Sequence, residues 1–567
     1  MGGRDFEDLC RSITDEILSW DPSYSTQLGW RKHDHLMMDP RKEAFDHQSA
    51  RLSEFMVSLG GFAEEGLSAE QVIDRDLAIY LFRLRKFEIT RLRIHEQMSI
   101  AEEEIGRSLF FLLVRDHPPF EERMEAITAR LERTPEFLDR AKTVLTRPCQ
   151  AWNEFALRTG EELPVFLETV LQTGRSKLES DEHIMRLSSA VEECLEAVVS
   201  HEEWLRDEVL PNAAPENAIT PEDFDDYLHL KGLDVTADEA LRIAEVGLEA
   251  ANRQRTELAK AIAPSGEFTE AVKMMKDDRP STFPETLKSY RQAILDAREF
   301  ARARGLVSIP ESEKLLVIET PRFMRHLAPL AAQYEPGKYT PDMTGFFLVT
   351  HDESNPGLMR EHCHAAIVNT AVHESYPGHH LQGICANQNP SHIRSLSAAP
   401  CFVEGWALYC EKMMSAEGFG SAPLLKLAQL NDLVFRIARV RADVSLAKGT
   451  MTPKDVAALL TEETGMDEHA ALDEAIGYTY SITTYLSYFI GMLRVLQLRE
   501  DVERALGSHF RVKEFHDSLL NAGSLPVHFM RRVEALRLKK EFGVDLPEPE
   551  ETLLRFLTRL VSQARPF

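Results

Sequence analysis

The sequence predicts a mainly helical protein that carries a small β-sheet beside one histidine-rich helix. Apolar residues recur at helical spacing over most of the chain, and two short runs of aromatic, β-branched and leucine residues interrupt that pattern. The third observation is the segment from His373 to His380, which places three imidazoles and one carboxylate within eight residues. The chain has 567 residues and is 43% apolar, which is enough for a substantial core.

Periodicity and capping signals mark the predicted helices. The first helix stops at Asp21-Pro22, after an apolar face formed by Phe6, Leu9, Ile13 and Ile17. Thr236 and Glu239 have the spacing of a capping box. Thr452-Pro453-Lys454-Asp455 places an N-cap, a first-turn proline and an acid in order. We therefore expect helices to begin after Thr236 and after Thr452.

Two segments read as strands. The runs 315–318 (Leu-Leu-Val-Ile) and 346–349 (Phe-Phe-Leu-Val) are short and are bounded by turn residues. We expect them to pair in a small sheet beside the histidine-rich helix. A role in binding a ligand and a purely structural role, as buried strands, are both open for them.

The chain is predicted to divide into two regions. The stretch 264–284 is polar and rich in Pro, Asp and Lys, so it is the best candidate for a linker or an exposed loop. We therefore expect an N-terminal helical region over residues 1–285 and a region that carries the chemistry over residues 286–567. One continuous helical body is the alternative.

Composition excludes several classes of partner. The net charge of −27 and the pI near 5.3 argue against nucleic acid and anionic membrane surfaces. We find neither a signal peptide nor an apolar run of spanning length. The seven cysteines are scattered without zinc-ribbon spacing, which favours free thiols in a reducing compartment. These features predict a cytoplasmic protein.

The segment His373-Glu374-Ser375-Tyr376-Pro377-Gly378-His379-His380 carries the main chemical signal. Neutral imidazoles bind a divalent metal ion, an acidic ligand completes the site, and a general base activates the water. Glu404 is the candidate for the acidic ligand. The sequence therefore predicts one Zn²⁺ per chain with an open position for water, although manganese or cobalt fits the same ligands.

The spacing differs from that of an HExxH helix, in which the histidines are four residues apart on one face. On an unbroken helix His379 would face away from His373, and His380 would lie about 10 Å further along the axis. Pro377-Gly378 therefore predicts a bulge or local unwinding that absorbs two residues. His379 is then the second ligand, and His380 is the alternative.

With these residues the chain resembles the HExxPGHH family of uncharacterised proteins (domain of unknown function 885), a relative of the gluzincin metallopeptidases. The resemblance rests on 373–380 and on the segment 401–409 (Cys-Phe-Val-Glu-Gly-Trp-Ala-Leu-Tyr). Weaker matches are 21–39 near the start and, near the end, 515–517 (Phe-His-Asp) followed by 523–527 (Gly-Ser-Leu-Pro-Val).

The resemblance implies a large helical gluzincin-like metallopeptidase fold with a deep cleft or channel, in which an edge strand pairs with substrate backbone. By the same resemblance, His373, His379 and Glu404 are the metal ligands and Glu374 is the general base.

The chain also departs from the family pattern. Gly477 precedes Tyr478 where the family commonly has arginine, 482–484 (Ile-Thr-Thr) stands where it has Pro-Gly-Gln, and Ala447 stands where it has histidine. A lost guanidinium or imidazole alters the binding of a substrate carboxylate before it alters the metal site.

An oxyanion formed during hydrolysis needs a second donor besides the metal. Tyr478 and Tyr488 are the candidates, although core packing is the commoner role for aromatics in such an apolar run. Glu411, seven residues after Glu404, is a candidate for orienting the ligands, and a surface carboxylate is the alternative. A structural, hydrogen-bonded role is expected for His516, and an imidazole near the site is the alternative.

The predicted function is a zinc-dependent peptidase of short peptides, in which Glu374 activates the water. Two alternatives remain open: a hydrolase of another small amide, and a binding protein of the same fold without turnover. Neither nucleic acid nor a membrane is expected as a partner, and the sequence does not determine the oligomeric state.

Overall fold

The structure is a computed structural model that describes residues 2–215, 221–325, 330–351 and 356–563. Its contacts divide the chain into two compact units. Unit 1 comprises residues 1–218, 321–327 and 336–343, and unit 2 comprises the rest of the chain. The division falls near residue 218 instead of the expected 285, because helices that follow residue 220 pack with the C-terminal half. For example, α11 (Ala237–Ile262) lies against α18 (Pro423–Ala447).

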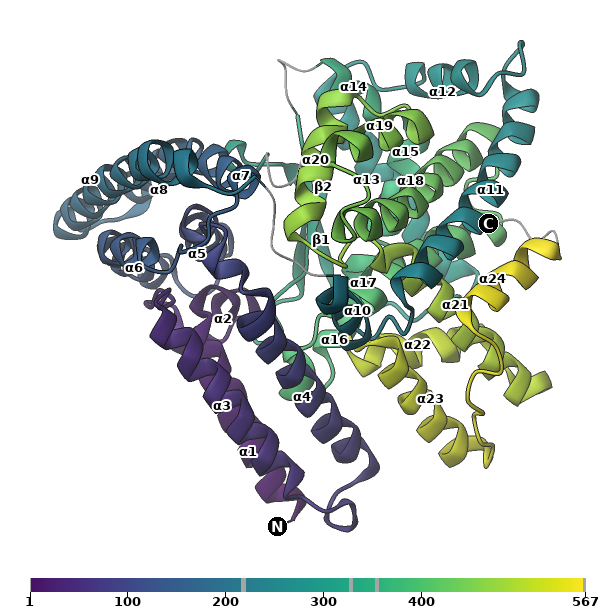
Figure 1. The fold of residues 1–567 in the computed structure, drawn as a ribbon, viewed down its shortest axis with the longest axis horizontal. Coiled ribbons are helices and arrows are strands. Elements are labelled where there is room, and N and C mark those ends of the chain that lie inside the picture. Colours follow the sequence, from purple (N-terminus) through teal and green to yellow (C-terminus); the bar gives the residue numbers. More distant parts are fainter. Residues whose placement is uncertain (1, 216–220, 326–329, 352–355, 564–567) are drawn as a thin grey trace. The chain divides into compact units, whose positions relative to one another are not determined.

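Unit 1 is built from helices (Figure 1). Asp21 follows the last residue of the first helix, as expected. It is also the N-cap of the second helix, where its side chain accepts a hydrogen bond from the Tyr24 N–H at 2.9 Å. The long helices α3 (Lys42–Gly60) and α4 (Ala69–Phe87) pack side by side. The helices are α1 (Gly3–Trp20), α2 (Pro22–Leu28), α3 (Lys42–Gly60), α4 (Ala69–Phe87), α5 (Ala101–Val114), α6 (Phe120–Lys142), α7 (Gln150–Gly160), α8 (Leu163–Lys177) and α9 (Asp181–Trp204).

Unit 2 contains the remaining helices and the sheet. Thr236 and Thr452 cap α11 and α19 as predicted. The helices are α10 (Pro221–Leu230), α11 (Ala237–Ile262), α12 (Phe268–Asp277), α13 (Phe283–Ala303), α14 (Pro356–Glu361), α15 (His364–Glu374), α16 (His379–Asn387), α17 (Pro400–Ala416), α18 (Pro423–Ala447), α19 (Pro453–Thr464), α20 (Glu468–Tyr480), α21 (Ser487–Leu506), α22 (Val512–Ala522), α23 (Val527–Phe542) and α24 (Leu553–Ser562).

The sheet has three strands in the order β1-β3-β2. Both predicted strands are present: β1 (Lys314–Glu319) runs parallel to β3 (Thr344–Val349). The third strand, β2 (Ala331–Tyr334), pairs antiparallel with β3 and was not predicted, because its sequence Ala-Ala-Gln-Tyr lacks β-branched residues. The prediction of a mainly helical fold with a small sheet is confirmed.

The predicted linker at 264–284 is not a linker. Helix α12 occupies the middle of it, and three of the apolar side chains of this helix are buried in unit 2. Ala271, Val272 and Met275 pack in one cluster with Ala259 and Leu427. Lys273, Lys276 and Asp277 lie on the less buried side of this short amphipathic helix.

Candidate metal centre

The histidine-rich segment forms two helices separated by a short break. Helix α15 ends at Glu374 and α16 begins at His379. Across the break the Gly378 N–H donates to Val372 O at 3.2 Å, and the Leu381 N–H donates to Ser375 O at 3.2 Å. Both bonds span six residues, whereas helix bonds span four. The break therefore takes up two extra residues, as the spacing predicted.

Glycine is required at position 378 because the backbone folds tightly against it. A Cβ atom there would lie 1.8 Å from the carbonyl oxygen of His373 and 2.4 Å from that of Val372. The indole N–H of Trp406 donates to the Pro377 carbonyl at 2.9 Å and joins the break to α17. The Pro377-Gly378 break and Trp406 are therefore parts of one structural feature, because Trp406 holds the break against α17.

The break brings His379 beside His373. The two imidazole rings are perpendicular, with centroids 4.8 Å apart. Nε2 of His379 lies 3.3 Å and Nε2 of His373 lies 3.6 Å from the same carboxylate oxygen, Oε2 of Glu404. His373, Glu374 and His379 also offer ligand atoms that all lie within 4.8 Å of one another. The structure therefore brings together all four residues of the predicted site.

These residues fit a divalent metal ion. Two imidazole nitrogens and a carboxylate are a donor set that zinc prefers. Oε2 of Glu404 and Nδ1 of His379 are buried, and neither has a hydrogen-bond partner among the described residues. Burial opposes charge on both residues of the Glu404–His379 pair, but their mutual attraction keeps the pKa of Glu404 below its ordinary value and that of His379 above it. A metal ion bound by Glu404 and His379 would compete with the protons that these two side chains otherwise bind.

A buried carboxylate orients His373. Nδ1 of His373 lies 2.7 Å from Oε1 of Glu411, so that Nε2 remains for a metal ion. The amide of Asn369 donates to Oε2 of Glu411 at 2.8 Å and to Asp432 at 2.7 Å. Sequence reasoning missed Asn369 and Asp432. The signal that could have found Asn369 is its place one helical turn before His373.

His380 belongs to a different network. It is fully buried, and its Nε2 lies 2.9 Å from Oε2 of Glu313, the residue before strand β1. The hydroxyl of Tyr376 and the guanidinium of Arg298 donate to the same carboxylate. This network joins α16 to the sheet. The sequence did not single out Glu313. Its contact with His380 keeps that imidazole away from the Glu404 carboxylate.

Glu404 is placed by a close crossing of α17 and α21. A Cβ on Gly405 would lie 2.4 Å from the carbonyl carbon of Gly491, and one on Gly491 would lie 1.9 Å from the carbonyl oxygen of Cys401. The two backbones touch there, and Glu404 is adjacent to the contact. The glycine of the Glu-Gly-Trp segment therefore sets the position of a predicted ligand.

The two candidate tyrosines differ in their surroundings. The Tyr478 hydroxyl donates to Glu474 at 2.8 Å and accepts the Arg439 Nε–H at 3.0 Å. The Tyr488 ring lies parallel to the His373 ring at 6.3 Å between centroids. Burial, and then the negative charge of Glu404, raises the pKa of Tyr488. Tyr488 is thus next to the predicted ligands, and the hydroxyl of Tyr478 is engaged elsewhere.

Arg439 supplies a guanidinium to this region. It comes from α18, and its Cζ lies 5.0 Å from the ring centroids of both Tyr485 and Tyr488. The chain has Gly477 instead of an arginine before Tyr478, yet a guanidinium still contacts the Tyr478 hydroxyl.

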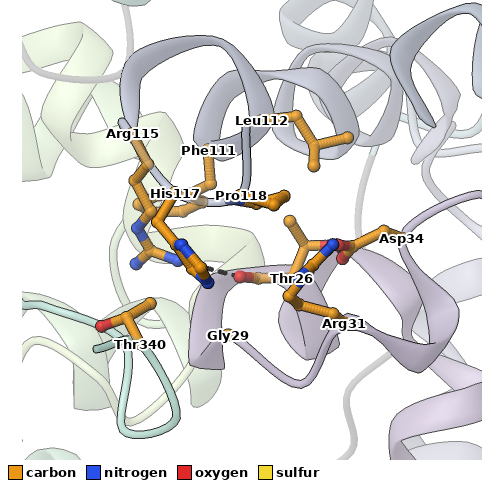
Figure 2. Close-up of a pocket in the computed structure, with 10 residues that line it drawn as sticks. All are labelled: Thr26, Gly29, Arg31, Asp34, Phe111, Leu112, Arg115, His117, Pro118 and Thr340. Atoms are coloured by element: carbon orange, nitrogen blue, oxygen red, sulfur yellow. Dashed lines mark hydrogen bonds and ion pairs between the residues drawn. The ribbon is translucent and has the colours of Figure 1, made fainter. Parts of the chain in front are cut away.

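Two other family-like segments have structural roles. In unit 1, Thr26, Gly29 and Asp34 line a small pocket with Arg115 and Thr340 (Figure 2). The Thr26 hydroxyl donates to Asp34 at 2.8 Å, and a Cβ on Gly29 would meet Thr340 at 2.8 Å. The segment thus holds the turn that follows α2 against residues 337–340.

In unit 2, His516 lies 2.7 Å from the Tyr409 hydroxyl and 2.8 Å from the carbonyl oxygen of Leu306. Both of its ring nitrogens are therefore engaged in structural contacts.

Residues 22–533 match the family model described as "Bacterial protein of unknown function (DUF885)". The chain belongs to this family. No protein with a curated description matches it.

Two similar solved structures cover almost the whole chain. One is a putative lipoprotein of unknown function from Shewanella oneidensis, with 21% identity and a TM-score of 0.76 over 93% of this chain and 99% of that one. The other is a putative lipoprotein from Colwellia psychrerythraea, with 17% identity and a TM-score of 0.81 over 95% and 99%. A carboxypeptidase from Pyrococcus furiosus aligns at 12% identity with a TM-score of 0.34 over 92% and 98%.

The prediction of a cytoplasmic protein is wrong, since both similar folds belong to putative lipoproteins. An acidic surface and buried thiols suit a folded body on either side of a membrane, so composition does not decide location. All seven cysteines are free and buried. Among the described helices, none is long and apolar enough to cross a membrane.

Proposed function

We propose that this protein is a zinc-dependent hydrolase of amide bonds whose substrates are short peptides. The observation that carries the proposal is the convergence of the His373 and His379 Nε2 atoms on one oxygen of Glu404, with Glu374 in the same cluster. Three ligands leave an open position, which is typical of a catalytic zinc site and not of a structural one.

The roles of the residues follow from their places. His373, His379 and Glu404 would hold the metal, which when bound supplies a Lewis acid that polarises a carbonyl and acidifies water. Glu374 is half-buried at the end of α15, next to the ligand His373, and accepts the proton of the attacking water. It then returns this proton to the leaving nitrogen. The Tyr488 hydroxyl donates a hydrogen bond to the oxyanion.

Metal content is the first test. We expect about one zinc per wild-type chain, purified without chelators and measured by plasma mass spectrometry. Glu404→Ala should lose most of it, because two imidazoles alone hold the ion poorly. Glu417→Ala is the matched control, since Glu417 follows the other end of the same helix. No zinc in the wild type, even after zinc is added back, would refute the proposal and favour a binding protein.

A second test distinguishes Tyr488 from Tyr478 as the donor to the oxyanion. Tyr488→Phe should lower kcat by about 10²–10³-fold on a cleaved peptide, since it removes an oxyanion donor. Tyr478→Phe should change kcat little and lower stability by about 1 kcal/mol, because it removes the hydroxyl between Arg439 and Glu474. Steady-state kinetics and thermal unfolding measure both. The opposite order of effects on kcat would assign the donor to Tyr478.

A further inference from the structure

The turn between α20 and α21 contains a strained residue. Thr483 has a φ of +63° and is fully buried. β-branched residues rarely adopt this left-handed conformation, and it persists only where surrounding contacts enforce it. The turn lies between Tyr478 and Tyr488, so whatever holds it also affects the place of both tyrosines.

Asp443 of α18 provides such contacts. Its Oδ1 accepts the Thr483 N–H and its Oδ2 accepts the Leu486 N–H, each at 3.2 Å. The carboxyl group is 1% exposed, and this burial raises its pKa to about 7. Burying a carboxyl group costs free energy unless hydrogen bonds compensate for the lost water. An apolar side chain would fill the same space at lower cost, so we assign the role of Asp443 to its two bonds with backbone N–H groups.

The two bonds act on the first turn of α21. Leu486 is the N-cap residue of this helix, and Tyr488 follows two positions later. On the other side of Tyr488, Gly491 is fixed against the backbone of Cys401. Tyr488 therefore lies between two anchored points, of which Asp443 provides the first.

We propose that Asp443 is a positioning residue for Tyr488: it holds Thr483 in the left-handed conformation and thereby keeps the Tyr488 ring over His373. This inference rests on the proposed function, in which the Tyr488 hydroxyl is the donor to the oxyanion. It explains both the burial of the Asp443 carboxyl group and the positive φ of Thr483.

A rescue experiment tests the inference. Asp443→Asn keeps one acceptor oxygen but turns an NH₂ group towards the second N–H, so we expect kcat to fall about 10-fold or more with KM and zinc content unchanged. Adding Thr483→Gly should restore most of kcat, because glycine adopts positive φ without strain. Asp501→Asn, a buried aspartate further along α21, is the control and should leave kcat unchanged.

Hydrogen exchange gives a readout that does not need turnover. In Asp443→Asn the amides of residues 483–490 should exchange at least about 10-fold faster, and those of α17 should keep their rates. Unchanged exchange would overturn the inference, as would faster exchange with an unaltered kcat in an active enzyme. A wild-type protein that hydrolyses no amide overturns the proposed function alone, and exchange still decides whether Asp443 holds the turn.

Discussion

Glu374→Gln should reduce kcat by about 10²–10⁴-fold while zinc remains bound, because it removes the general base and leaves the ligands in place. Glutamine has the same shape as glutamate but cannot accept the water proton. Glu374 is the last residue of α15, directly after the ligand His373, and belongs to the cluster whose donor atoms lie within 4.8 Å. It is also only half-buried, so that a water molecule and a substrate can reach it.

The measurement combines kinetics with zinc analysis on the same preparation. Glu361→Gln is a suitable control, because Glu361 ends the neighbouring α14 and pairs with Lys276. Wild-type kcat in Glu374→Gln would disprove the mechanism. Loss of zinc together with activity would instead make Glu374 a ligand.

Gly378→Ala should abolish zinc binding and lower the free energy of unfolding by about 3 kcal/mol or more. The added methyl group would overlap the carbonyl oxygens of His373 and Val372, which belong to the backbone and cannot turn aside as a flexible side chain does. The break must then open, and His379 moves away from Glu404. The same displacement frees the Trp406 indole from the Pro377 carbonyl.

Zinc content and denaturant unfolding of Gly378→Ala measure the two effects together. Gly106→Ala is the control, because its Cβ would meet only a Leu163 methyl at 3.8 Å and alanine favours the helix. A Gly378→Ala protein that keeps zinc and wild-type stability would show that the break does not require glycine.

Helix-forming segments and strands could be predicted from the sequence where the signal is local. Capping by Thr236 and Thr452 and the strands β1 and β3 depend on residues close together in the chain, and the structure contains all four. The division at residue 218, the burial of α12 and the pairing of β2 depend on distant partners. Weak local patterns do not reveal such partners.

The same contrast between local and distant determinants applies to the candidate site. The sequence by itself determined which residue types are present and that Pro377-Gly378 must absorb two residues, since helix geometry follows from spacing alone. Only the tertiary structure separated His379 from His380, through Glu313, and Tyr488 from Tyr478, through Glu474 and Arg439. Glu474 lies one helical turn before Tyr478 in α20, whereas Arg439 and Glu313 come from other parts of the fold, 39 and 67 residues away from their partners. Packing decides which side chains meet across such distances, and spacing along the chain does not encode it.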